Sequence, residues 1–226
     1  QALVNLSAAP APAGTFDVRE RQRVFYGQGL VRESPNGDPV PRDLRLDVYE
    51  PIGAPGPRPA LVLIHGGGFF KGGPRFARLV EWANEFSSRG WVSFSIAYRL
   101  RDMHGSYPAA WGETLDREYP EYAELGRMIY PAVRDAKAAV RWLRAHADTY
   151  QVDPDHIAVF GASAGAVIAV ALAVTSDEQY RDELTLEQDP TLATTHLDRS
   201  ARVQSVISLS GSDGAVRLLD QMTDIS

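Results

Sequence analysis

Ser163 lies in the pattern Gly161-Ala162-Ser163-Ala164-Gly165, between an apolar run typical of a buried strand and an apolar run typical of a helix. A G-x-S-x-G sequence in this context predicts a nucleophile elbow, a sharp turn that raises the serine Oγ above the end of a sheet. The N-terminus of the following helix favours negative charge at the reacting centre. The alternative interpretation is a serine that caps a helix after a glycine-rich turn. We expect Ser163 to be a nucleophile.

A second cluster runs from His65 to Phe69 in the order His-Gly-Gly-Gly-Phe, directly after a continuous apolar run at residues 60–64. Glycines allow backbone N–H groups to approach a substrate oxygen closely. Acyl transfer needs such donors, because its tetrahedral intermediate carries an oxyanion. A flexible loop is the alternative interpretation of this cluster. Since both patterns follow predicted strands, together they predict acyl-transfer chemistry.

Strand and helix patterns alternate through most of the chain. This order predicts a mostly parallel sheet with helices on both faces. In such sheets ligands bind beyond the carboxyl ends of the strands, where both glycine-rich patterns fall. The predicted strands are residues 23–26, 44–49, 60–64, 91–98, 156–160 and 203–209, and the predicted helices are 76–88, 132–150 and one that starts at Ala164.

The length of 226 residues predicts one domain. We expect residues 1–20 to form an extended arm, because they include a Pro/Ala-rich stretch, and residues 21–226 to belong to a single α/β domain. Residues 99–130 are a long mixed segment of a kind that is usually functional or partly structured, and we expect this insertion near the active site. Its aromatic residues suit a bulky or aryl ester, although such side chains more often serve packing. They are Tyr107, Trp111, Tyr119 and Tyr122.

The sequence resembles the hormone-sensitive-lipase and carboxylesterase branches of the α/β-hydrolases. The resemblance covers residues 44–211 and rests on segments 65–69, 97–100 and 152–165. It implies the α/β-hydrolase fold, with Ser163 as the nucleophile and no metal or organic cofactor. By the same resemblance the amides of Gly67, Gly68 and Ala164 would form the oxyanion hole. His65 would brace the glycine loop and would not act as the base.

The chain departs from the family pattern beside the nucleophile. Relatives often carry an acidic residue before the serine and a further glycine after the elbow, whereas Ala162 and Ala166 stand at these positions here. Both alanines conserve the shape of the backbone. The departures therefore bear on the subfamily and not on the chemistry.

A serine nucleophile needs a general base, and the base needs an orienting acid. In this fold both follow the nucleophile, in the order Ser, then Asp or Glu, then His. His196 is the only histidine after Ser163. It precedes the predicted strand 203–209, whereas the family's histidine follows the last strand, so we do not expect His196 to be the base. His104 and His146 are weaker candidates, which we expect on the surface.

Asp213 follows the last predicted strand, where a few lipases carry their acid, but a turn aspartate is the preferred interpretation. The sequence stops at Ser226, before the later strands and helices of the fold, which would leave an unpaired sheet edge. We therefore expect an N-terminal portion of a longer polypeptide, whose C-terminal remainder supplies the catalytic acid and histidine.

Composition excludes several classes of function. The net charge of -6 and the pI near 5.4 argue against nucleic acid as a partner. The absence of cysteine removes disulfides, thiolate metal sites and cysteine nucleophiles. No segment reaches the roughly 20 apolar residues of a membrane span. The chain begins with Gln1 rather than Met. A removed secretory signal or an expression-derived start would explain this. Of the two, we expect a secreted protein.

The sequence thus predicts a carboxylic-ester hydrolase that acts on a small-molecule ester through an acyl-enzyme on Ser163. An amidase or formamidase would use the same parts. A non-catalytic binding module of the same fold is also open, because no base is assigned. The patterns do not distinguish the natural ester or the oligomeric state.

Overall fold

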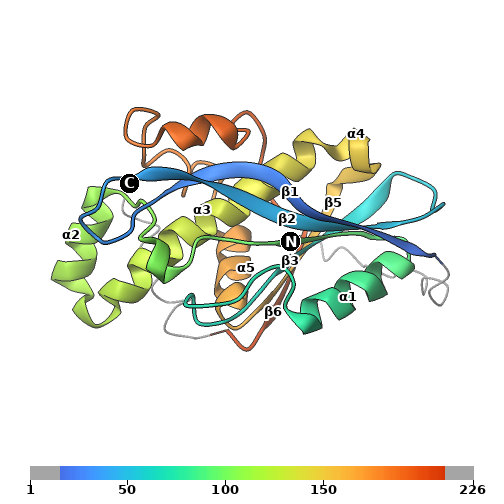
Figure 1. The fold of residues 1–226 in the computed structure, drawn as a ribbon, viewed down its shortest axis with the longest axis horizontal. Helices are drawn as coiled ribbons and strands as arrows, with labels where there is room; N and C mark the ends of the chain where they lie inside the picture. Colours follow the sequence, from blue (N-terminus) through green and yellow to red (C-terminus); the bar gives the residue numbers. More distant parts are fainter. Residues whose placement is uncertain (1–15, 212–226) are drawn as a thin grey trace.

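Six strands form one sheet in the computed structural model, which describes residues 16–211 (Figure 1). The strands are β1 (Val18–Val31), β2 (Val40–Pro51), β3 (Arg58–Ile64), β4 (Val92–Ile96), β5 (Val152–Ala162) and β6 (Ser205–Leu209). The helices are α1 (Ala77–Ser88), α2 (Ala109–Glu118), α3 (Ala123–Ala145), α4 (Ala147–Tyr150) and α5 (Ala164–Val174). Short 3₁₀ turns are η1 (Arg101–Met103), η2 (Pro120–Tyr122) and η3 (Pro190–Thr194).

The strand order is β1-β2-β4-β3-β5-β6. β1 and β2 are antiparallel to their neighbours, whereas β3, β4, β5 and β6 run parallel. The carboxyl ends of the four parallel strands therefore meet at one edge of the sheet. β3 and β5 are direct neighbours, with Ile64 paired to Gly161. Their register brings the segments that follow these two strands together at that edge.

Helices cover both faces of the sheet, α1 on one face and α3 with α5 on the other (Figure 1). Alternate residues of β3 serve the two cores because side chains alternate along a strand. Leu61 and Leu63 pack with Leu79 and Ala83 of α1. The large core on the other face includes Ala60, Val62 and Ile64 of β3, Val133 and Val140 of α3, and Val167 and Ile168 of α5. This double burial explains the continuous apolar run of β3.

The first strand is longer than the sequence indicated. β1 begins at Val18 and pairs with β2 as far as Val31. The last three residues of the expected arm, 18–20, are therefore part of the sheet. The pairing of β1 with β2 includes shifts in register between Arg21 and Val24 and between Phe25 and Gly27. Such irregularities interrupt the alternation of side chains from which a strand is predicted.

Helix α3 starts at Ala123, nine residues before the predicted start at Ala132, and ends at Ala145. Pro131 lies inside it, although an interior proline typically costs about 3 kcal/mol. The turns before Pro131 gain burial that offsets this cost, because Ile129 and Tyr130 are nearly inaccessible. Residues 147–150 form the separate short helix α4.

The insertion 99–130 is mainly helical. Helix α2 packs against the first turns of α3, and the contact is so close that a Cβ atom on Gly126 would lie 2.5 Å from Leu115 Cδ2. Trp111 is buried, and its ring lies 4.9 Å from that of Tyr130 and 5.5 Å from that of Tyr180. Trp111 therefore serves packing. In residues 16–211 no helix has the length and apolar character needed to cross a bilayer.

Candidate active site

Ser163 occupies the junction between β5 and α5 with φ 54° and ψ −117°. A positive φ is uncommon for a residue with a side chain and typically costs about 1–3 kcal/mol. The side chain is exposed and makes no capping hydrogen bond to α5. The geometry is thus that of the predicted elbow, and the interpretation of Ser163 as a helix-capping side chain is wrong.

Two glycines make the elbow sterically feasible. A Cβ atom on Gly161 would lie 2.0 Å from the carbonyl oxygen of Gly165, and one on Gly165 would lie 2.2 Å from that of Ile64. Such separations are far inside van der Waals contact. The first turn of α5 therefore packs directly on the end of β3, and only glycine fits at either position.

The backbone of Ser163 is anchored on both sides. Its N–H donates to the carbonyl oxygen of Leu209 in β6 at 2.8 Å, and its own carbonyl accepts from the amides of Ala166 and Val167. The Ser163 amide is therefore engaged in the sheet. The next amide, that of Ala164, has no acceptor among residues 16–211. At a helix N-terminus such an amide is a ready anion donor.

The glycine loop after β3 lies directly against the elbow. A Cβ atom on Gly66 would lie 2.8 Å from the carbonyl oxygen of Ala162 and 3.1 Å from Ser163 Cβ. Gly67 and Gly68 have φ 119° and 63°, and the Gly67 carbonyl accepts from the amide of Phe70 at 3.0 Å. Within the described chain the amides of Gly67 and Gly68 have no acceptor. Neighbouring strands thus place the glycine loop and Ser163 side by side.

His65 is 1% exposed and lies beneath this loop. Its ring stacks on Tyr98 with centroids 4.2 Å apart, Nδ1–H donates to the Gly66 carbonyl at 2.7 Å, and the Tyr98 hydroxyl donates to the His65 carbonyl at 2.9 Å. Burial lowers the pKa of His65, so the ring is neutral at neutral pH. All of these contacts hold the loop in place, which agrees with a bracing position.

A buried ion pair fixes the segment that follows β4. Asp135 of α3 accepts from the Arg99 amide at 2.8 Å and from Arg99 Nη2 at 2.7 Å, and Arg99 Nη1 donates to the Leu30 carbonyl at 3.0 Å. Both side chains are almost fully buried. Asp135 was not predicted from the sequence, because its partner lies 36 residues away and no local pattern marks the pair.

The remaining histidine candidates lie elsewhere. His196 contacts His146, with ring centroids 5.5 Å apart, and His146 Nδ1–H donates to the Trp142 carbonyl at 2.8 Å. His146 follows α3 just before β5 begins, so both rings lie at the edge opposite Ser163. His104 lies in the insertion with φ 42°. All three are half-buried, so His104 and His146 are partly exposed at the surface. Asp213 lies outside the described residues.

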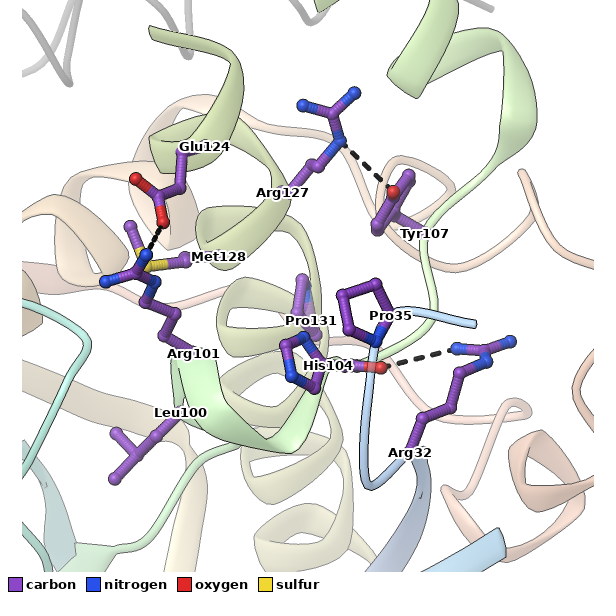
Figure 2. Close-up of a pocket in the computed structure, with 11 residues that line it drawn as sticks. Arg32, Pro35, Leu100, Arg101, His104, Tyr107, Glu124, Arg127, Met128 and Pro131 are labelled. Atoms are coloured by element: carbon purple, nitrogen blue, oxygen red, sulfur yellow. Dashed lines mark hydrogen bonds and ion pairs between the residues drawn. The ribbon is translucent and has the colours of Figure 1, made fainter. Parts of the chain in front are cut away.

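A cavity of about 550 Å³ lies between the end of β1, the segment 100–107 and the first turns of α3 (Figure 2). Of the insertion's aromatic residues named above, Tyr107 lines this cavity. Residues 16–211 contain no cluster of three or more His, Cys, Asp or Glu side chains placed to hold a metal ion.

Fold and elbow geometry define the class as the α/β-hydrolases. The chain belongs to the BD-FAE family, whose model matches residues 46–114 and 119–224. The predicted relationship to α/β-hydrolases of the hormone-sensitive-lipase and carboxylesterase type is confirmed.

Named relatives and a solved structure are esterases. Esterase LipC of Mycobacterium tuberculosis is 29% identical over 166 residues, covering 73% of this chain and 32% of LipC. Carboxylesterase 1C of Rattus norvegicus is 27% identical over 192 residues, covering 80% of this chain and 32% of that protein. The butyrate-bound esterase of Thermogutta terrifontis has a TM-score of 0.53 at 24% identity, covering 87% of this chain and 53% of that one, which shows similarity of fold. The chain thus spans about a third of the length of these curated relatives.

Proposed function

We propose that the polypeptide containing this chain is a carboxylic-ester hydrolase in which Ser163 is the nucleophile. The observation that carries the proposal is the exposed Ser163 at positive φ, directly against a glycine loop whose amides lack acceptors in the described chain. The esterases among its relatives support the same chemistry.

In this mechanism Ser163 Oγ attacks the ester carbonyl carbon while its proton passes to a general base. The carbonyl oxygen becomes an oxyanion that accepts hydrogen bonds from the amides of Gly67, Gly68 and Ala164. Collapse of the tetrahedral intermediate breaks the bond to the alcohol oxygen, which leaves with the proton from the base. Water then adds to the acyl-enzyme by the same route and releases the acid.

The glycine-loop and α5 amides contribute because they are fixed before the reaction. Donors that need no reorganisation stabilise a developing charge more than mobile water does, and loss of one such donor typically costs about 2.7–4 kcal/mol of barrier. The α5 N-terminus adds its positive partial charge at the same point. The hydrogen bond from the Ser163 amide to β6 and the contacts of His65 hold the elbow and the glycine loop in position.

We assign the general base and its orienting acid to residues after the described part of the chain. His146 and His196 lie together at the opposite edge of the sheet, and His104 lies in the insertion. The chain covers only about a third of each of these curated relatives, which leaves room for further strands. The hydrogen bond from the Ser163 amide to the Leu209 carbonyl ties β6 to the elbow. A strand that pairs in parallel with β6 would bring its carboxyl end to the same edge of the sheet.

Hydrolysis of p-nitrophenyl acetate and butyrate by the full-length protein tests the proposal, with matched p-nitroanilides run in parallel. We expect ester turnover that falls at least about 10⁴-fold in Ser163→Ala. The matched control is Ser176→Ala, an exposed serine just after α5, which should keep its activity. Faster turnover of anilides than of esters would favour an amidase. Ester turnover that is unchanged in Ser163→Ala would contradict the proposal.

A further inference from the structure

The cavity described above is linked to the glycine loop through Arg101, which lines the cavity. The Arg101 amide donates to the Phe69 carbonyl at 2.9 Å, and the Arg101 guanidinium lies 5.0 Å from the centre of the Phe70 ring. Phe69 directly follows Gly68. Arg101 and its neighbour Leu100 also line the cavity (Figure 2). Arg101 therefore lies between the cavity and the end of the glycine loop, and a substrate that extends from the loop past Arg101 would enter the cavity.

Apolar side chains form much of the cavity lining, and the backbone holds them firmly. Leu100, Met128 and Pro131 line it, and Met128 and Pro131 belong to α3. A Cβ atom on Gly105 would lie 2.7 Å from Pro131 Cβ, so the segment that carries His104 packs tightly on α3. The cavity is thus preformed and suits an apolar chain or ring.

The three arginines of the cavity differ in their partners. Arg101 forms an ion pair with Glu124. Arg127 forms one with Asp116 at 2.6 Å and donates to the Tyr107 hydroxyl at 3.1 Å. Arg32 has no carboxylate partner within residues 16–211. Its Nη1 donates weakly to the His104 carbonyl at 3.3 Å and to Ser106 Oγ at 3.5 Å.

Arg32 is positioned to bind an anion. Its amide donates to the Met103 carbonyl at 2.9 Å, which ties the end of β1 to the wall of the cavity. Its Nε and Nη2 atoms have no acceptor among the described residues, and this edge of a guanidinium is the fork that binds a carboxylate through two hydrogen bonds. The side chain is half-buried, so solvent screens its charge less than at a fully exposed site.

We propose that this cavity binds a carboxylate carried by the ester substrate, with Arg32 as the residue that recognises it. The substrate class is then monoesters that carry a free carboxylate, separated from the ester by an apolar spacer against Leu100, Met128 and Pro131. This inference rests on the proposed esterase function. It adds a specificity determinant to it, because Arg32 would distinguish these esters from neutral ones of the same shape.

Two series of substrates test the inference on the full-length protein at low ionic strength. One series consists of mono-p-nitrophenyl esters of linear dicarboxylic acids with four to eight carbons. The other consists of butyrate esters of carboxyphenols. Each carboxylate is compared with the matching carboxamide. We expect at least a tenfold higher kcat/KM for the carboxylate in one series, at the spacer length that reaches Arg32.

The variants are Arg32→Gln, Arg32→Lys and the charge-matched control Arg89→Gln, an exposed arginine that pairs with Glu85 at the end of α1. Arg32→Gln should remove the tenfold preference, mainly through KM, while kcat/KM for the carboxamides stays the same. Arg32→Lys should retain part of the preference, and Arg89→Gln should retain all of it. Thermal unfolding of each variant verifies that it is folded.

The outcomes separate this inference from the esterase proposal. Turnover of neutral esters with no carboxylate preference, or with a preference that survives in Arg32→Gln, would overturn the inference and leave the esterase proposal standing. Absence of all ester turnover would contradict the esterase proposal. Calorimetric titration of Ser163→Ala with monomethyl adipate and monomethyl suberate then tests the cavity separately. Binding that Arg32→Gln abolishes supports the carboxylate site, whereas equal binding or none overturns it.

Discussion

Gly66 and Ser163 lie so close that a Cβ atom on Gly66 would be 3.1 Å from Ser163 Cβ and 2.8 Å from the Ala162 carbonyl oxygen. The two residues are far apart in the sequence and follow two neighbouring strands of the sheet. This approach places the glycine loop directly against the serine. It also makes the loop position sensitive to a single added methyl group.

Gly66→Ala should lower ester turnover strongly and lower the free energy of unfolding only moderately. The added methyl group must move the loop away from the elbow, and a misplaced oxyanion donor costs about 10²–10³ in kcat. The free energy of unfolding should fall by only about 1–3 kcal/mol. Gly73→Ala is the matched control, because a Cβ atom there meets nothing within 4 Å. Equal kcat values for the two variants would contradict a dependence of ester turnover on the position of the glycine loop.

Gly165→Ala should impair folding itself. Its methyl group would lie 2.2 Å from the Ile64 carbonyl and 2.7 Å from that of His65, and both are backbone atoms that move only with β3. We expect a loss of about 3 kcal/mol or more in the free energy of unfolding, measured by urea denaturation. A variant with wild-type stability would contradict the direct packing of α5 on β3.

Asp135→Asn should destabilise the protein by about 3–5 kcal/mol, because it leaves the buried guanidinium of Arg99 without its counter-charge. Glu81→Gln is the control, since it breaks the exposed pair with Arg78 and should cost no more than about 1 kcal/mol. Chemical denaturation of both variants measures the difference. Costs of equal size would contradict a structural role for the buried pair.

Stability should fall as the pH is lowered from 7.5 to 5.5. Burial lowers the pKa of His65 from its usual 6.5, so the unfolded state binds a proton before the folded state does. The contribution of neutral His65 to stability is full above the pKa that His65 has in the unfolded chain. It is lost as the pH falls below that pKa, by at most about 1.4 kcal/mol per pH unit. Urea denaturation across this range measures the slope.

His65→Gln should reduce this slope. His196→Gln is the comparison: burial also lowers the pKa of His196, but this half-buried ring should contribute less. An unchanged slope in His65→Gln would show that a different group carries the pH dependence.

The elbow was predictable from sequence because its requirements are local. A strand, a serine between glycines and an apolar helix are consecutive in the chain, and the glycines are needed because an added Cβ atom would lie 2.0–2.2 Å from a backbone oxygen. The central strand β3 was predictable for a similar reason, since burial on both faces requires a continuous apolar run.

Other features depend on contacts between distant segments, which sequence patterns do not show. The start of α3 was not predicted because Pro131, a residue that usually ends a helix, lies inside it. Its first turns are held by packing on α2. The Arg99–Asp135 pair joins positions 36 residues apart. Arg32 lines the cavity because β1 ends beside η1, and neither its sequence neighbours nor its residue type marks it.

Covalent labelling of the full-length protein with a fluorophosphonate, read by intact mass and peptide mapping, tests the central claim most directly. An activated serine beside an oxyanion hole reacts with this reagent, whereas an ordinary serine does not. We expect one adduct on the peptide that contains Ser163 and none in Ser163→Ala. The absence of an adduct on the wild-type protein, or an adduct on another serine, would contradict the assignment of Ser163 as the nucleophile and would favour a binding protein of this fold.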